Sequence, residues 1–349
     1  MAGPPCARRR ERRVCRIAPA TEDRVFAAAK SLNYRPSYQK RMVRRGRADV
    51  VGFVMSFADR RDLGGAFWHA IQEGAETRAR IAGLDVLLVS GRSHAEAFRR
   101  TRNYYRENRI DAAVVPGHFV SLLEDPIDMP LVLLLTEPHE VPWPSVVLDA
   151  KPGIDEAIAH LRELGHRELL WVHEAPPFEA MRERGLMVEA AAGRAGMAFH
   201  ALGLDIGVKG EPAKGVPLET YNAACHGVAM ANIAELQRHT AVFCYNDRLA
   251  LGVMAALQRA GKRIPEDVSL VGFDDLQGVN TIPRLTSVSH RLDDIGAAAV
   301  ELALRMVDHP EQMPNLRGSV KTLTARLVVG KSTAKPQLKR AHQTKTQPA

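Results

Sequence analysis

Two hydrophobic patterns recur along the chain from residue 50 onward. Short apolar runs rich in Val, Ile and Leu are typical of buried strands, and longer stretches with apolar residues three or four apart are typical of amphipathic helices. The runs that predict strands are VVGFVMSF, LDVLLVS, DAAVVP, PLVLLLTE, SVVLDA, RELLWVHE, TAVFCYN and VSLVGFDD. Helical patterns separate most of them, as in residues 66–83 and 247–261.

Apolar strands that alternate with helices predict parallel sheets covered on both faces. Roughly ten such units are too many for one sheet, and 349 residues are too many for one ordinary domain. We therefore expect an α/β fold with two lobes, each a doubly wound parallel sheet. Ligands bind such sheets outside the carboxyl ends of the strands, so the residues that follow the strands are the candidate site.

The net charge of +8 is concentrated at the two ends of the chain. Residues 1–49 hold 14 Lys and Arg against 4 Asp and Glu, residues 331–349 hold 5 against none, and the 281 residues between them carry a net charge of −7. A basic head attached to a mildly acidic body is expected of a segment that binds phosphates. We interpret the basic tail as a solubilising segment.

Several classes of protein are disfavoured by the sequence. No apolar run is long enough to span a membrane, and the first twenty residues lack the apolar core of a secretory signal, so we expect a cytoplasmic protein with no membrane partner. The four widely spaced cysteines show no metal-ligand pattern and predict free thiols. G-x-S-x-G, H-E-x-x-H and phosphate-loop motifs are absent. The chain is therefore expected to bind a ligand without being an enzyme, and with no cofactor or metal.

Aromatic and basic residues follow two of the predicted strands. Phe67 and Trp68 open a helix after the first strand, where adjacent aromatics are either a packing pair or a platform for a sugar or base. Arg182 and Arg184 open a later helix. Such a pair is either a solvated helix face or a source of planar donors for hydroxyls or a carboxylate.

Amide and carboxylate side chains follow two further strands. Asn246 and Asp247 open a helix. One of them is either simply the N-cap, or capping and ligand binding coexist, because the two residues supply separate side chains. Asp274 and Asp275 end a strand. Paired carboxylates are used in acid–base catalysis, but consecutive strand residues point to opposite faces, so the pair is a poor catalytic candidate.

Four stretches together resemble the lactose-repressor/galactose-repressor (LacI/GalR) family of bacterial transcription regulators. They are LRELGHRELLWV (161–172), TAVFCYNDRLALGVMAALQRAGKRIPEDVSLVGFDD (240–275), PRLTSVSHRLDDIGAAAVELAL (283–304) and RLVVGKST (326–333). The resemblance extends from about residue 17 to 333 and is weakest over 200–220. The block 240–275 is the most specific part.

This resemblance implies a periplasmic-binding-protein-like core of two lobes with a small effector between them. Regulators of this family are typically homodimers whose affinity for operator DNA depends on the effector. The residues that match the family's effector-binding positions are Phe67, Trp68, Arg182, Asn246 and Asp274. Their side chains suit a polyhydroxylated ligand such as a sugar. Leu186 replaces an aromatic of the family, and Gly65-Ala66 replaces its usual Asn-Pro, so the identity of the effector stays open.

The resemblance also implies a domain plan, with a partial all-α DNA-binding head before the core. The predicted segments are an atypical Arg-rich stretch (1–16), a remnant of the head (17–49), the core (50–333) and a disordered basic tail (334–349). Within the core, the N-lobe is expected over about 50–149 plus 280–308, and the C-lobe over about 150–279 plus 309–330.

The segment RIAPATEDRVFAAAKSLNYRPS resembles the third helix of the family's head. Thr21 is expected as its N-cap, and Val25, Ala28, Ala29 and Leu32 have the spacing of a buried face. SYQKRMVRRGR then falls on the family's hinge helix, with valine in place of the leucine that is inserted into the minor groove. The residues expected at DNA are Tyr34, Arg35, Ser37, Lys40, Arg41, Val43 and Arg44.

The family's first two head helices have no counterpart in MAGPPCARRRERRVC. That stretch has two prolines and no hydrophobic periodicity, so we expect no recognition helix there. Either the gene is read from a wrong start or frame, which we favour because RIAPAT resumes the family pattern abruptly, or the protein is a natural core without a sequence reader. Other readings left open are a transporter-type sugar-binding protein and a regulator fragment that acts through mixed dimers.

Overall fold

The computed structural model describes residues 18–32, 46–56, 64–122, 129–134, 142–177, 179–206, 218–276 and 282–337. The chain divides into two compact units, Met1–Arg47 and Ala48–Ala349, which we treat separately.

The described part of the first unit is helix α1, Pro19–Ser31. Its N-cap is Ala18, which makes no side-chain cap hydrogen bond. The prediction of Thr21 as the N-cap is therefore wrong. The proline, whose fixed φ suits the first helical turn, begins the helix before Thr21.

The expected buried face of α1 is exposed. Val25 is 61% and Leu32 78% exposed, so nothing among the described residues covers this face. The residues expected at DNA, Tyr34, Arg35, Ser37, Lys40, Arg41, Val43 and Arg44, lie outside the described residues, and their role stays a prediction.

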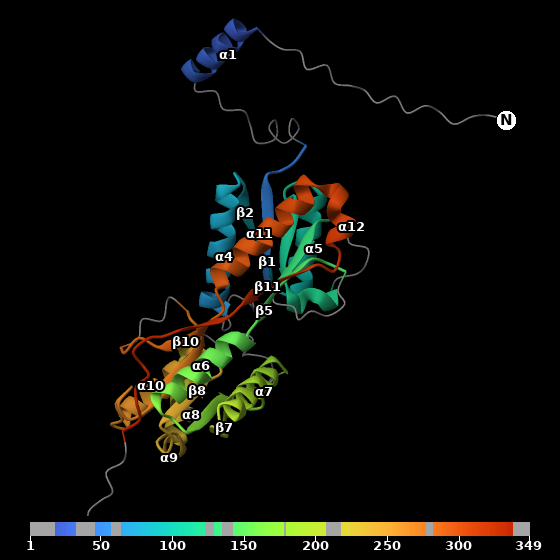
Figure 1. The fold of residues 1–349 in the computed structure, drawn as a ribbon. Helices are drawn as coiled ribbons and strands as arrows, with labels where there is room; N and C mark the ends of the chain where they lie inside the picture. The colour runs from blue at the N-terminus through green and yellow to red at the C-terminus, as the bar shows by residue number, and fades with distance from the viewer. Residues whose placement is uncertain are drawn as a thin grey trace, which may run out of the picture. The chain divides into compact units, whose positions relative to one another are not determined.

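The second unit contains two six-stranded sheets, each in a lobe of its own (Figure 1). The N-lobe sheet has the order β11-β5-β4-β3-β1-β2, with all its strands parallel. Its strands are β1 (Val50–Ser56), β2 (Asp85–Gly91), β3 (Ala112–Pro116), β4 (Leu131–Leu134), β5 (Ser145–Asp149) and β11 (Val320–Thr324). Its helices are α4 (Gly64–Ile81), α5 (His94–Arg106), η1 (Gly117–Leu122), α11 (Leu292–Asp308), η2 (Pro310–Gln312) and α12 (Met313–Leu316).

The C-lobe sheet has the order β12-β10-β9-β8-β6-β7 and is parallel except for β12, which runs antiparallel to β10. Its strands are β6 (Glu168–Glu174), β7 (Ala198–Leu204), β8 (Ala241–Cys244), β9 (Ser269–Asp274), β10 (Thr286–Ser289) and β12 (Arg326–Val328). Its helices are α6 (Lys151–Leu164), α7 (Glu179–Arg194), α8 (Leu218–Ala231), α9 (Ile233–Leu236) and α10 (Asp247–Arg259). Within the described residues, no helix has the length and apolar character needed to cross a membrane.

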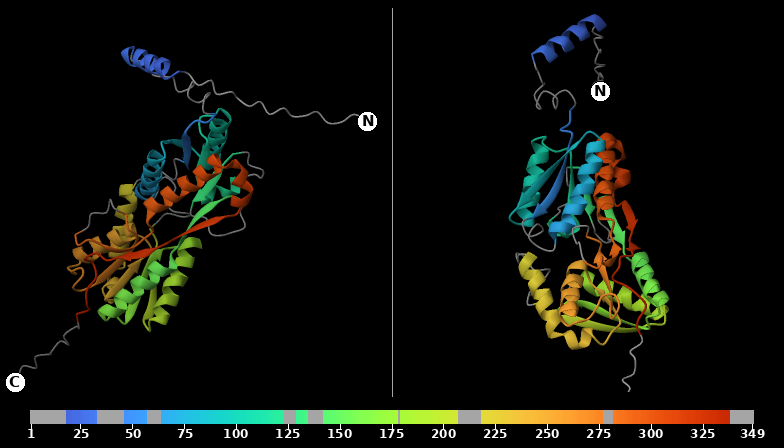
Figure 2. Two further views of the ribbon diagram at one scale, coloured as in Figure 1. Left: turned by 45° about the horizontal axis from the view of Figure 1, so that its top comes forward. Right: turned by 90° about the vertical axis from the view of Figure 1, so that its left-hand side faces the viewer.

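The chain passes between the lobes three times. Figure 2 shows the two lobes from two further sides. The passages lie at Ala150, at His290–Arg291 and at Ala325. The expected lobe boundaries therefore need correction, because β10 belongs to the C-lobe sheet and β11 to the N-lobe sheet. Each strand is short, and its hydrogen-bonded neighbour decides its lobe: β10 pairs with β9, and β11 pairs with β5.

Two glycines bring helices α4 and α11 of the N-lobe into close contact. A methyl group placed on Gly74 would lie 1.9 Å from the carbonyl oxygen of Asp293, and one on Gly296 would lie 1.8 Å from that of Ile71. Only glycine permits such an approach of two backbones. This packing fixes α4, which carries the aromatic pair of the candidate site at its start.

Candidate ligand-binding site

The candidate site is centred on a buried contact between Asp274, the last residue of β9, and His290, which follows β10. His290 Nε2 lies 3.3 Å from Asp274 Oδ1, and the two side chains are 7% and 14% exposed. Burial raises the pKa of Asp274 to about 7, against the opposing influence of Arg184 and Arg248. Burial, and then the nearby Arg184 charge, lower the pKa of His290 well below its ordinary value. Near neutral pH the Asp274 carboxyl can therefore accept or donate a hydrogen bond.

The backbone at the end of β9 has an uncommon conformation. Asp274 has φ of +108° and Asp275 has φ of +52°, both in the range that favours glycine. Such strain is typically retained at functional sites, where the surrounding structure holds it. Here it turns the chain at the carboxyl edge of the sheet, where ligands of doubly wound folds bind.

Arg184 of α7 faces the same edge of the C-lobe sheet. Its guanidinium Nη1 donates to the carbonyl oxygen of Tyr245 at 2.7 Å. The guanidinium carbon lies 3.7 Å from the centre of the Phe273 ring and 4.4 Å from that of Tyr245. These contacts place a planar cation beside Asp274, which agrees with its influence on the pKa of that carboxyl.

Arg182 lies elsewhere on the same helix. It is exposed, donates to the carbonyl oxygen of Pro177 at 2.7 Å, and pairs with the Glu179 carboxylate. Residues two apart on a helix point in very different directions, so Arg184 faces the carboxyl edge of the C-lobe sheet and Arg182 faces solvent. Arg184 therefore influences Asp274 electrostatically, and the expected role of Arg182 in binding the effector stays a prediction.

Asn246 is the N-cap of α10, as expected for one of the two residues there. It is 4% exposed, and its Oδ1 accepts from the backbone N–H of Leu249 at 2.8 Å. The cap uses the side-chain oxygen, so the amide N–H groups take no part in it. Asp247, in contrast, is occupied by two buried hydrogen bonds, from Ser287 Oγ at 2.6 Å and from the Leu276 N–H at 2.9 Å.

The aromatic pair lies in contact with this cluster from the N-lobe side. Phe67 and Trp68 are half-buried near the start of α4, with ring centres 5.4 Å apart. The ring centres of Phe67 and His290 are 5.8 Å apart, and Trp68 is 6.1 Å from His118, which follows β3. The expected aromatics and Asp274 therefore belong to one cluster, connected through His290.

Chemically, the cluster offers a titrating carboxyl, a guanidinium, an amide and aromatic faces. Carboxylates and planar donors recognise hydroxyl groups, and an aromatic face covers the apolar side of a ring. Three members were not assigned from the sequence: Arg184, His290 and His118. His118 closely follows the predicted strand DAAVVP and could have been found by inspecting the residues after each predicted strand, whereas His290 follows β10, which the hydrophobic pattern does not predict.

Comparison with known proteins places the chain in a family. The periplasmic binding protein-like domain matches residues 158–333, half of the chain. The HTH-type transcriptional repressor PurR of Aliivibrio fischeri is 24% identical over 315 residues, which cover 88% of this chain and 89% of PurR. The HTH-type transcriptional regulator AscG of Escherichia coli is 27% identical over 304 residues, which cover 85% of this chain and 86% of AscG. The chain belongs to the LacI/GalR family.

Solved structures share the fold of this LacI/GalR protein. The lac repressor dimer bound to operator and the anti-inducer ONPF has a TM-score of 0.69 and 20% identity, with 91% of this chain and 92% of that chain covered. A LacI family regulator from Enterococcus faecium with bound ribose has a TM-score of 0.63 and 20% identity, with 82% of this chain and all of that chain covered. The expected family and the two-lobed α/β fold are confirmed. The roles of the five expected effector residues stay predictions.

Proposed function

We propose that this LacI/GalR protein is a transcriptional repressor whose affinity for operator DNA is set by a small polyhydroxylated effector, a sugar or related polyol. The observation that carries the proposal is the line of contacts from Arg184 and Asp274 through His290 to Phe67. It joins the carboxyl edge of the C-lobe sheet to the aromatic pair of the N-lobe. A ligand bound there touches both lobes.

The same cluster defines which ligand fits. Asp274 accepts from one sugar hydroxyl, and Arg184 donates to a neighbouring one, because a planar fork matches vicinal oxygens. Asn246 adds amide donors, and Trp68 covers the apolar face of the ring. Ribose is bound in the E. faecium relative and cellobiose in the regulator CelR, which supports a carbohydrate as the ligand class.

Control of DNA binding follows from linkage. A ligand that contacts both lobes stabilises one arrangement of them, and the three chain passages at Ala150, His290–Arg291 and Ala325 are the segments that take up any change between arrangements. The effector changes DNA affinity by the ratio of its affinities for the DNA-competent and DNA-incompetent states. The protein acts as a homodimer and binds its effector without turning it over.

The experiment that tests this function has two steps. A thermal-shift screen of mono- and disaccharides identifies a ligand, and a gel-shift assay then measures DNA binding by the full chain over a salt series with and without that ligand. We expect weak binding that depends steeply on salt and little on sequence, because phosphate contacts from the basic residues 31–47 dominate. The ligand should change the DNA affinity at least several-fold. A DNA affinity that the ligand leaves unchanged would contradict the proposed control.

A further inference from the structure

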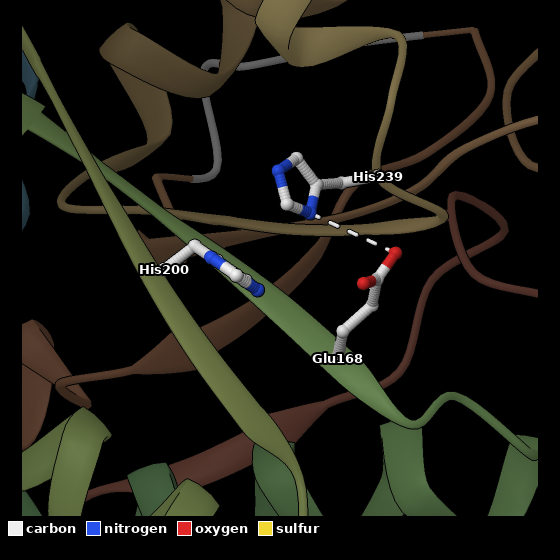
Figure 3. A group of neighbouring side chains, drawn as sticks. All are labelled: Glu168, His200 and His239. Carbon is white, nitrogen blue, oxygen red and sulfur yellow. Dashed lines mark ion pairs between the residues drawn. The ribbon is translucent and has the colours of Figure 1, made fainter.

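A second cluster of side chains lies at the other edge of the C-lobe sheet. Glu168 is the first residue of β6, His200 is the third residue of β7, and His239 lies two residues before β8 (Figure 3). One ligand atom from each of the three lies within 4.8 Å of the others. Glu168 and His239 lie by the amino ends of β6 and β8, whereas Asp274 ends β9, so the two clusters are separate.

His239 is the buried member, with a side chain that is 6% exposed. Its Nε2 lies 3.2 Å from Glu235 Oε1, one turn earlier in the chain. A carboxylate only accepts, so Nε2 is the donor in this contact. Arg238 Nη1 lies 3.1 Å from the other oxygen of the same carboxylate, Glu235 Oε2.

The other ring nitrogen of His239 is directed at the cluster. Nδ1 is buried, has no hydrogen-bond partner among the described residues, and lies 3.8 Å from Glu168 Oε1 (Figure 3). In the neutral imidazole that donates through Nε2, Nδ1 carries a lone pair. Two acceptors, Nδ1 and the Glu168 carboxylate, then face each other, and a cation between them resolves this repulsion.

His200 supplies a second imidazole and an open side. Its ring centre is 5.0 Å from that of His239, and the two rings are tilted by 49°. His200 is exposed and the Glu168 side chain is 41% exposed, so an ion can reach the cluster from solvent. Two imidazoles and one carboxylate are ligands that suit Zn²⁺, with positions left for water.

We propose that the C-lobe holds a Zn²⁺ site with Glu168, His200 and His239 Nδ1 as ligands. Glu235 is a positioning residue that fixes the His239 tautomer, as a carboxylate commonly does for a metal-bound histidine. The ion joins β6, the edge strand β7 and the segment before β8, which lie far apart in sequence. It therefore stabilises the C-lobe, and the proposal does not depend on the identity of the effector.

The test is a thermal-shift titration of the full chain with ZnCl₂ after treatment with EDTA. We expect the melting temperature of the wild type to rise by about 2–5 °C at saturating Zn²⁺. His200→Ala and Glu168→Gln should lose this rise. Both positions are exposed enough for the variants to fold. Glu235→Ala should retain the site with an affinity for Zn²⁺ lowered about 10–100-fold, as measured by competition with a chelator.

His309→Ala is the matched control. His309 Nδ1 lies 3.3 Å from Glu311 Oε1 in an exposed pair. The substitution therefore removes a surface histidine next to a carboxylate and leaves the Glu168, His200 and His239 cluster unchanged. It should respond to Zn²⁺ as the wild type does. A wild type without a Zn²⁺-dependent rise would overturn the proposal. A rise that persists unchanged in His200→Ala would overturn it as well, because the ion would then bind elsewhere.

Discussion

His290 Nε2 lies 3.3 Å from Asp274 Oδ1, directly before the chain leaves the C-lobe for the N-lobe. The next residue, Arg291, has a left-handed backbone with φ of +51° and precedes α11. A ligand that binds Asp274 therefore acts beside one of the three passages between the lobes. From this position the proposed effector can change the conformation of the His290–Arg291 passage, and with it the relative arrangement of the lobes.

The stability contribution of Asp274 should depend on pH. Its pKa is raised in the folded protein to about 7, so its contribution is fully present below about pH 4 and is lost as the pH rises through 7. Asp274→Asn keeps the shape of the side chain and removes its titrating carboxyl group. The free energy of unfolding of the wild type should therefore fall relative to that of the variant by about 1–3 kcal/mol between pH 5 and pH 8, as measured by urea denaturation.

The reference for this comparison is Asp267→Asn. The hydrogen bonds from Arg263 lower the pKa of Asp267 to about 2, so Asp267 stays ionised throughout this pH range. The difference in free energy of unfolding between the wild type and Asp267→Asn should be independent of pH from 5 to 8. If the difference in free energy of unfolding between the wild type and Asp274→Asn were equally independent of pH, burial would not raise the pKa of Asp274.

Arg184 and Arg182 provide a matched pair of variants for the effector site. Arg184→Ala removes a guanidinium beside Asp274 and should weaken binding of an identified sugar about tenfold to a hundredfold, the value of a charge-assisted hydrogen bond. Arg182→Ala removes a solvent-exposed guanidinium from the same helix and should leave the affinity unchanged. Isothermal titration calorimetry measures both. If Arg182→Ala weakened sugar binding and Arg184→Ala did not, Arg182 would be the arginine that binds the effector, as the sequence motif predicts.

The close contact between α4 and α11 should tolerate no side chain. Gly296→Ala should lower the free energy of unfolding by about 1–3 kcal/mol or more, because its methyl group meets the Ile71 carbonyl oxygen. Gly193→Ala is the control: it lies in α7 with no atom within 4 Å of the added carbon. That variant should gain about 0.5–1 kcal/mol from helix propensity, since alanine is favoured over glycine. Equal effects of the two substitutions would contradict the close packing.

The hydrophobic pattern predicts the central strands well. Every residue of β1, β3 and β8 is buried, and a continuous apolar run is the expected signature of such strands. The edge strand β7 was not predicted, because its residues are mostly exposed and give no alternation. β11, an exposed strand at the edge of the N-lobe sheet, gives no buried run either, and its lobe depends on its pairing with β5.

The candidate site was only partly predictable from the sequence. The motif that contains Arg182 and Arg184 is visible, but which of them faces Asp274 depends on how α7 is rotated against the sheet. His290 follows a four-residue strand, and its contact with Phe67 joins segments more than two hundred residues apart. The cluster of Glu168, His200 and His239 has no spacing that a motif could capture, because the sheet order β7-β6-β8 brings its members together.

Binding of a small ligand across the carboxyl edges of the two sheets can be measured by calorimetric titration of the full chain and of Asp274→Ala with the sugars found in a thermal-shift screen. We expect saturable binding of at least one sugar by the wild type, and loss of that binding in Asp274→Ala while its circular dichroism spectrum and cooperative melting are retained. Binding of equal affinity by the folded variant would show that Asp274 does not bind the ligand.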